Sequence, residues 1–326
     1  MTLQETTSAS YDPMLFGVEL PLRGRFYPLG FALDIETNHP EVLACAGESW
    51  GGLPSLFDEP PIRVRLAVSP GEAGAALPIP SFRGMAHLFA IVGDANNYAV
   101  CDYTRAFAYG WATEPLVTGH AWFRWYFLEA IAYYLLTQLY VTQVHAACVA
   151  RNGRGLLLCG TSGMGKSTLA FACARRGWTY VCDDAAIFVQ KREGRTAFGQ
   201  PQRIRFRESA PSVLPELDGR MVGNGINGKP TIEIPTVELP GFDTGPQAEV
   251  TELVFLERDG RREAALVPLQ PTAALDRLLQ DSPLYDAPTT DRQRRCLAHL
   301  SQAPSFELRY GDLHSAVAAL NSLTDR

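Results

Sequence analysis

The chain has 326 residues, 46% hydrophobic and 20% charged, a globular composition that excludes a disordered chain and leaves room for two domains. Lysine and arginine number 29 against 35 aspartate and glutamate, so no nucleic-acid partner is expected from the net charge of −6. The seven cysteines stand mostly among apolar neighbours, which favours free thiols and a cytoplasmic location.

The N-terminal third indicates a tail followed by a β-rich domain. Residues 1–16 are polar and lack the apolar segment of a secretory signal, so we expect a flexible tail. A small α+β domain is expected over residues 17–120, with a short helix after Pro40. Its expected strands cover 31–35, 62–66, 87–92 and 98–103.

Residues 121–141 predict a helix that bridges two domains. Apolar residues recur at spacings of three and four and form one continuous face: Leu128, Ala132, Leu135, Leu136 and Leu139. Arg124 and Glu129 interrupt the apolar stretch, so we expect a buried helix and no membrane partner.

The second domain, residues 142–326, is expected to open with a β-hairpin. Two apolar runs, 144–150 and 155–159, flank Asn152-Gly153, a pair that strongly favours a two-residue turn. Strand pairing about that turn places His145 opposite Gly160. His145 would then lie at the mouth of the loop that follows. The alternative is a strand-end histidine that bonds a backbone carbonyl.

Residues 160–167, GTSGMGKS, fit G-x-x-x-x-G-K-[ST] between an apolar strand and an expected helix at 168–176. Glycines allow a tight turn whose N–H groups point into one concavity, and the helix N-terminus adds positive charge. Lys166 would contact the β- and γ-phosphates, and the Ser167 hydroxyl would bind Mg²⁺. This predicts a nucleoside triphosphate site, with ATP and Mg²⁺ as cofactors, formed by Gly160, Thr161, Ser162, Gly163, Met164, Gly165, Lys166, Ser167 and Thr168.

A carboxylate pair, Asp183-Asp184, ends the next expected strand at 178–182. Consecutive side chains of an extended chain point to opposite sides, so the two should have different roles. One would hold Mg²⁺, and the other would accept the proton of an attacking hydroxyl. The alternative makes both carboxylates metal-associated, with hydrolysis or switching as the outcome.

The segment 144–188, VHAACVARNGRGLLLCGTSGMGKSTLAFACARRGWTYVCDDAAIF, resembles the catalytic domain of HPr kinase/phosphorylase and its related kinases. His145 precedes Lys166 by 21 residues and Asp184 follows it by 18, in agreement with that family. The resemblance implies an α/β P-loop domain with a mixed sheet and flanking helices, and ATP-dependent phosphorylation of a serine-type hydroxyl. It further implies that His145 and Lys166 are active-site residues, that Asp184 is the proton acceptor, and that Asp183 lies near the metal.

The family's L-E-I-R-G-x-G-I segment, which supplies a further metal-binding glutamate, has no clear counterpart. Glu208 lies at roughly the right distance and is the candidate metal ligand, with an exposed surface glutamate as the alternative and Glu233 as a weaker rival. Residues 1–120 do not resemble the family's N-terminal domain. The expected acceptor is therefore a hydroxyl of a peptide, protein or small molecule. The sequence does not decide whether the chain forms a homo-oligomer.

Arg203, Arg205 and Arg207 alternate on an expected strand and share one face. They would bind an acidic acceptor or the triphosphate, or else mark a solvated edge strand. The loop 223–229 would close over the nucleotide or be a surface loop. The C-terminal region predicts a strand at 252–256 and helices near 272–280, 290–301 and 312–323.

Three functions follow, in order of preference. The first is a kinase, favoured by the histidine and the double aspartate. The second is an NTPase or nucleotide-dependent regulator without a phosphoacceptor, for which no water-positioning side chain is convincingly placed. The third is a non-catalytic nucleotide-binding module, which the intact Lys166, Ser167 and Asp184 disfavour.

Overall fold

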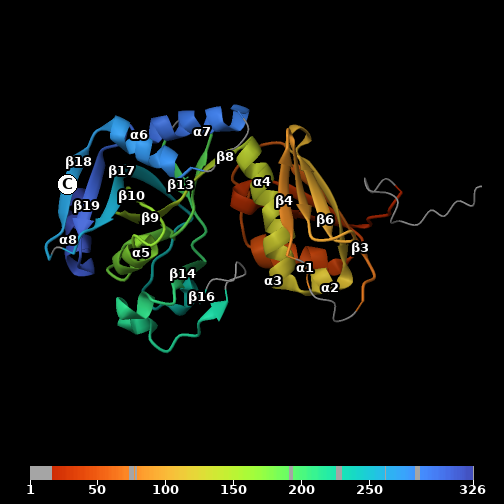
Figure 1. The fold of residues 1–326 in the computed structure, drawn as a ribbon, viewed down its shortest axis with the longest axis horizontal. Coiled ribbons are helices and arrows are strands. Elements are labelled where there is room, and N and C mark those ends of the chain that lie inside the picture. The colour runs from red at the N-terminus through yellow and green to blue at the C-terminus, as the bar shows by residue number, and fades with distance from the viewer. Residues whose placement is uncertain are drawn as a thin grey trace, which may run out of the picture. The chain divides into compact units, whose positions relative to one another are not determined.

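The computed structural model describes residues 17–72, 77, 79–190, 194–224, 230–260, 262–282 and 287–325. It divides into two compact units, Met1–Leu139 and Tyr140–Arg326, each with a mixed sheet and helices (Figure 1). The expected tail at 1–16 and most of the loop at 223–229 lie outside the described residues. Among the described residues, no helix is both long and apolar enough to cross a membrane.

The first unit contains a seven-stranded sheet in the order β1-β2-β3-β7-β6-β5-β4, in which β3 runs parallel to both of its neighbours. In β3, Ile62, Val64 and Leu66 are buried while Arg63 is exposed, the period of two that predicted this strand. The strands are β1 (Leu22–Phe26), β2 (Leu33–Thr37), β3 (Ile62–Ser69), β4 (Ser81–Met85), β5 (Leu88–Val92), β6 (Tyr98–Asp102) and β7 (Phe107–Thr113).

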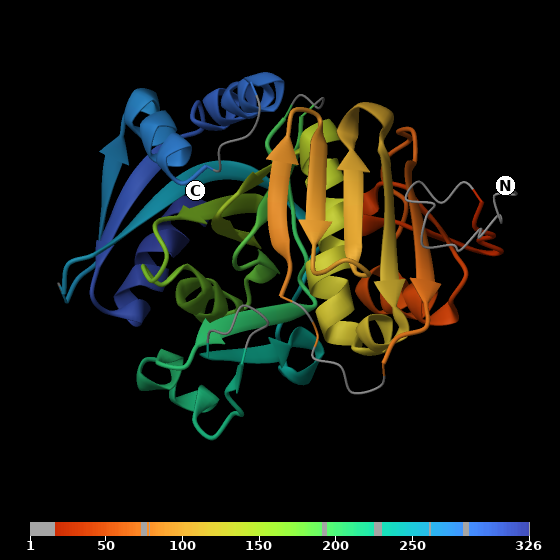
Figure 2. The same ribbon diagram turned by 45° about the vertical axis from the view of Figure 1, so that its right-hand side comes forward.

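The expected bridging helix differs from the structure in two ways. It is interrupted by a π-helical segment, Arg124–Glu129, and it packs within the first unit: Tyr133 lies edge-on to Trp50, and Tyr134 stacks on Phe89 at 4.1 Å between ring centroids. Figure 2 shows this helix behind the strands. The contact with Phe89 attaches it to β5 of the sheet and the contact with Trp50 attaches it to α1, so the helix packs as part of the first unit. The helices are α1 (Pro40–Trp50), α2 (Glu114–Thr118), α3 (His120–Phe123) and α4 (Ala130–Leu139).

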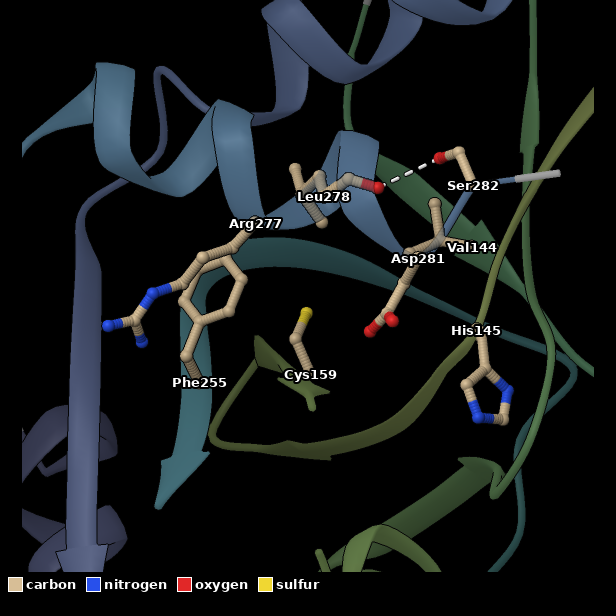
Figure 3. A pocket seen from close by; sticks show the side chains of 8 residues that line it. All are labelled: Val144, His145, Cys159, Phe255, Arg277, Leu278, Asp281 and Ser282. Carbon is tan, nitrogen blue, oxygen red and sulfur yellow. Dashed lines mark hydrogen bonds between the residues drawn. The ribbon is translucent and has the colours of Figure 1, made fainter. Parts of the chain in front are cut away.

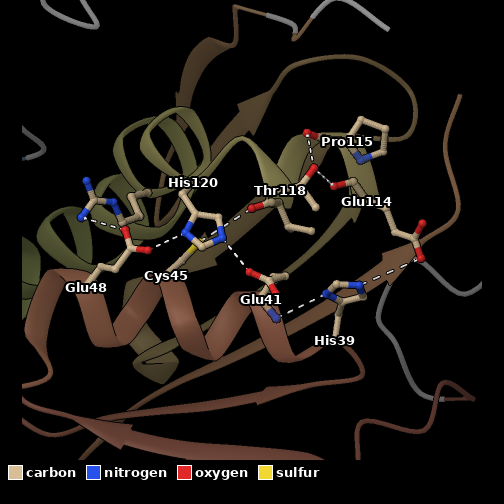
Figure 4. Close-up of polar contacts among 10 residues, drawn as sticks. His39, Glu41, Cys45, Glu48, Glu114, Pro115, Thr118 and His120 are labelled. Atoms are coloured by element: carbon tan, nitrogen blue, oxygen red, sulfur yellow. Dashed lines mark hydrogen bonds and ion pairs between the residues drawn. The ribbon is translucent and has the colours of Figure 1, made fainter. Parts of the chain in front are cut away.

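One histidine of the first unit lies between two carboxylates (Figure 4). Nε2 of His120 is 2.6 Å from a carboxylate oxygen of Glu41, and Nδ1 is 2.5 Å from one of Glu48. The hydrogen bonds that the ring donates to Glu48, and then to Glu41, raise the pKa of His120. Both glutamates belong to α1, so the ring ties α3 to that helix.

The second unit has a nine-stranded sheet in the order β11-β9-β10-β17-β13-β12-β8, with β19 beside β17 and β18 beside β19. Its strands are β8 (Val141–Val144), β9 (Ala146–Arg151), β10 (Arg154–Cys159), β11 (Thr179–Cys182), β12 (Ala186–Val189), β13 (Thr196–Phe198), β17 (Gln247–Arg258), β18 (Ala265–Leu269) and β19 (Ser305–Tyr310). A separate three-stranded sheet contains β14 (Arg203–Arg207), β15 (Gly223–Asn224) and β16 (Pro230–Pro235).

Helices cover both faces of the large sheet. Successive residues of β10 point to opposite faces and therefore enter different cores. Leu156 and Leu158 pack in a core with α5 and α8, whereas Leu157 and Cys159 pack in a second core with α6 and α7. The helices are α5 (Lys166–Ala174), α6 (Pro271–Gln280), α7 (Ala287–Leu300) and α8 (Leu313–Thr324), so the three C-terminal helices lie close to their expected positions.

The expected hairpin is confirmed. Arg151 pairs with Arg154 and Ala146 with Cys159, the register predicted for a turn between Asn152 and Gly153. Both turn residues have positive φ, 53° and 74°, which asparagine and glycine tolerate best. The hairpin therefore fixes where β10 ends and where the glycine-rich loop begins.

Candidate functional site

The glycine-rich loop joins the end of β10 to the start of α5. Gly165 has φ +95°, and a Cβ atom there would lie 2.7 Å from the Tyr310 hydroxyl, which donates to the Met164 carbonyl at 2.9 Å. Only glycine fits at that position. Because α5 begins at Lys166, the positive end of the helix faces the loop, an arrangement suited to phosphate. The residues predicted to bind nucleotide thus belong to one strand–loop–helix unit.

Lys166 is the first residue of α5 and is only 6% exposed. Its Nζ donates to the Gly160 carbonyl at 2.6 Å and lies 2.9 Å from Nε2 of His145. Burial lowers the pKa of this lysine. The ammonium therefore lies against the start of the loop, where an incoming phosphate would offer stronger partners than a carbonyl.

His145 and Asp184 meet because of the strand order. Before His145, Val144 pairs with Ala186; after it, Cys148 pairs with Cys182. The bend at His145 and the bend at residues 183–184 therefore lie side by side. Nδ1 of His145 is 3.1 Å from the backbone oxygen of Asp184 and 3.1 Å from its Oδ1.

The three side chains form a chain of hydrogen bonds. If Lys166 donates to Nε2 of His145, then that nitrogen accepts and the ring proton sits on Nδ1, facing Asp184; we assign the tautomer from these partners. The hydrogen bond to Asp184 raises the pKa of His145, and the same bond lowers the pKa of Asp184. The side chain of Asp184 is 70% exposed, so an external substrate can reach it.

Asp183 lies in a different environment, as expected for the neighbouring side chain. It is buried, and its Oδ2 accepts a hydrogen bond of 3.0 Å from the backbone N–H of Arg205. Burial raises its pKa to about 6. Asp183 thus ties β14 to the end of β11, and its role at a metal stays a prediction.

Replacing Asp183 by asparagine should change how stability depends on pH. The native carboxyl, with its pKa raised to about 6, holds a proton that the unfolded chain releases from about pH 4 upward. Native stability therefore falls as pH rises through that window, by roughly 3 kcal/mol for a shift of about two units. The asparagine of Asp183→Asn can still accept the hydrogen bond from the backbone N–H of Arg205. It carries no titrating carboxyl, so this contribution to the pH dependence of stability is lost. Denaturant unfolding at pH 4 and pH 7 measures the difference, and parallel stability profiles for the two proteins would contradict it.

The arginine row on β14 divides into two parts. Arg203 and Arg205 both pair with Glu233, so that carboxylate is already engaged. Arg207 instead donates from Nη2 to the Ser162 hydroxyl of the glycine-rich loop at 2.8 Å. No carboxylate pairs with Arg207 among the described residues. The sequence did not decide whether this row binds a ligand or marks a solvated edge strand. The structure brings one of the three arginines, Arg207, to the glycine-rich loop.

Glu208 is exposed in the turn after β14, and its metal role stays a prediction. Asp281, which sequence reasoning missed, lines a small hollow together with His145 and Cys159 (Figure 3). No local motif marks it: it reaches the site because α6 ends beside the sheet.

Comparisons with known proteins match parts of this chain. The family model of "SynChlorMet cassette protein ScmC" matches residues 122–202, the segment that carries His145, the loop and Asp184. HPr kinase/phosphorylases from three strains of Streptococcus thermophilus are 40% identical over 75 residues, 23% of this chain. The match spans 24% of each of those relatives, about a quarter of their length. The chain is thus distantly similar to HPr kinase/phosphorylase, as its sequence predicted.

Among solved structures, the HPr(Ser) kinase/phosphatase of Coxiella burnetii aligns with 56% of this chain and 98% of its own, at 16% identity and a TM-score of 0.32.

Proposed function

We propose that the chain is an ATP- and Mg²⁺-dependent kinase, related to HPr kinase, that phosphorylates a serine-type hydroxyl of a peptide, protein or small molecule. The observation that carries the proposal is the hydrogen-bonded series Lys166–His145–Asp184 beside a glycine-rich loop at a helix N-terminus. Hydrolysis would also need a side chain that positions the attacking water, and the sequence places none convincingly. An exposed carboxylate beside the phosphate-binding lysine also provides a proton acceptor for a second substrate.

The proposed reaction assigns one task to each residue. The loop N–H groups and Lys166 bind the triphosphate, and Lys166 exchanges the Gly160 carbonyl for phosphate oxygens. Mg²⁺, held by Ser167 with Asp183 or Glu208, would neutralise phosphate charge. The acceptor oxygen bonds to the γ-phosphorus as the bond to ADP breaks, and its proton passes to Asp184. Because the pKa of Asp184 is lowered, it accepts that proton late, when the new P–O bond is largely formed.

The proposal is tested by incubating the protein with ATP labelled in the γ-phosphate, Mg²⁺, and serine-containing peptides and amino acids. A kinase yields a labelled phosphoester whose amount depends on the acceptor. Labelled inorganic phosphate at the same rate with and without every acceptor would instead indicate an NTPase, and binding without turnover a non-catalytic module.

Arg207→Ala should slow turnover about 10- to 100-fold and weaken ATP binding only a few-fold. Its guanidinium lies over the loop, where it can contact a phosphoryl group as negative charge spreads over the equatorial oxygens. Arg203→Ala is the matched control, because Arg203 shares the strand and the face but pairs with Glu233. Steady-state kinetics and ATP titrations measure both; equal losses in the two variants would exclude a specific role for Arg207.

A further inference from the structure

The hollow beside His145 lies at the carboxyl end of β10, next to Phe255 of the parallel strand β17 and to the end of α6 (Figure 3). Cys159 and Phe255, which pair across the two strands, form part of its lining. His145 forms one side, and Asp281 and Ser282 form the other. Ligands of α/β proteins commonly bind outside the carboxyl ends of parallel strands. The hollow is about the size of one water molecule, so an acceptor would lie at its mouth, near the histidine that contacts both Lys166 and Asp184.

The charge of the hollow comes from Asp281. This residue caps the C-terminus of α6, where the helix dipole already places negative charge. Arg277 precedes it by one turn and would be its usual partner. Arg277 instead pairs with Glu307 at 2.5 Å and lies over the Phe255 ring, 5.5 Å from its centroid. Asp281 forms no ion pair within the described parts of the chain, so its charge is free to bind a cation.

We infer that Asp281 binds a positively charged nitrogen of the acceptor, so that the phosphorylated hydroxyl lies close to a cationic group. The inference rests on the proposed kinase function and narrows its substrate. Amino alcohols such as free serine have this chemistry, and so does a peptide serine next to a lysine. The cation is not consumed: the hydroxyl proton still passes to Asp184, and the phosphoryl group still leaves ADP.

A second role for Asp281 predicts a different result. Its negative charge also acts on Lys166 and favours the protonated ammonium. If supporting that charge were its only task, then removing it would weaken ATP binding and slow transfer to every acceptor alike. Binding of an acceptor cation instead predicts a loss restricted to cationic acceptors.

The test compares two matched pairs of acceptors, L-serine with N-acetyl-L-serine, and a serine hexapeptide containing lysine beside the serine with the same peptide containing glutamine. Wild type, Asp281→Asn and Asp276→Asn are assayed in parallel; Asp276 is an exposed aspartate of the same helix and serves as the control. For wild type and Asp276→Asn we expect about a three- to tenfold higher kcat/KM for the cationic member of one pair. In Asp281→Asn the two members should come within about twofold, with the ATP Kd changed by no more than a few-fold.

The pair that shows the preference identifies the source of the cation, a small amino alcohol or a basic peptide. Transfer without a preference in wild type, or a preference that survives Asp281→Asn, overturns the inference and leaves the kinase intact. If Asp276→Asn loses the preference for the cationic acceptor to the same extent as Asp281→Asn, the inference is overturned as well. ATP binding without transfer to any of the four acceptors would contradict the kinase itself, and this inference with it.

Discussion

Asp184→Asn is expected to lower kcat by about 10²- to 10⁴-fold while the ATP Kd changes by no more than a few-fold. The asparagine keeps an oxygen that can accept from Nδ1 of His145, so the local geometry should persist. It has no basic carboxylate to take the proton of the acceptor hydroxyl. Transfer to acceptor and ATP affinity, measured separately, distinguish these two effects.

Asp243→Asn is the matched control for this experiment. Asp243 accepts a hydrogen bond from Thr179 at the opposite end of β11, so its loss should leave turnover within about twofold. Turnover of Asp184→Asn within tenfold of wild type would exclude the carboxylate as the proton acceptor. Acceptor-independent phosphate release that survives the substitution would favour an NTPase.

His145→Ala is expected to lower turnover about 10- to 100-fold, far more than it lowers nucleotide affinity, because the ring joins Lys166 to Asp184. The substitution also has a pH signature. His145 holds the pKa of Asp184 below its ordinary value. Without the ring that pKa rises, so the acidic limb of the kcat/KM profile should move to higher pH.

His145→Gln retains a side-chain donor for Asp184 and should recover part of the turnover. His314→Ala, at an exposed histidine of α8, should behave as wild type. Equal losses of turnover and ATP affinity in His145→Ala would contradict the placement of the ring beside the transferred group. An unchanged acidic limb would show that Asp184 is not the group that titrates there.

The features predicted from the sequence are those with local signals. Asn152-Gly153 set the hairpin register, and the spacing of glycines placed the loop at 160–167. Alternating polarity predicted that Arg203, Arg205 and Arg207 share a face of β14. In each case, neighbouring residues determine the backbone without help from distant parts of the chain.

The contacts that could not be predicted from the sequence join segments that lie far apart along the chain. His145 and Asp184 are 39 residues apart, and their meeting depends on β8 pairing with β12 while β9 pairs with β11. Strand pairing about the hairpin placed His145 at the loop, but the choice of Asp184 over Asp183 came only from the family resemblance. The contact of Arg207 with Ser162 requires the small sheet to lie over the loop. The π-helical segment and the packing of α4 within the first unit likewise depend on tertiary contacts.

A crystal structure with Mg²⁺ and a non-hydrolysable ATP analogue would show where the triphosphate binds relative to Lys166, His145 and Asp184. We expect the triphosphate in the loop at 160–167, with Lys166 and His145 at the terminal phosphate and Asp184 facing the side from which an acceptor approaches. Phosphates bound elsewhere, or the side chains of His145 and Asp184 turned away from the terminal phosphate, would contradict it.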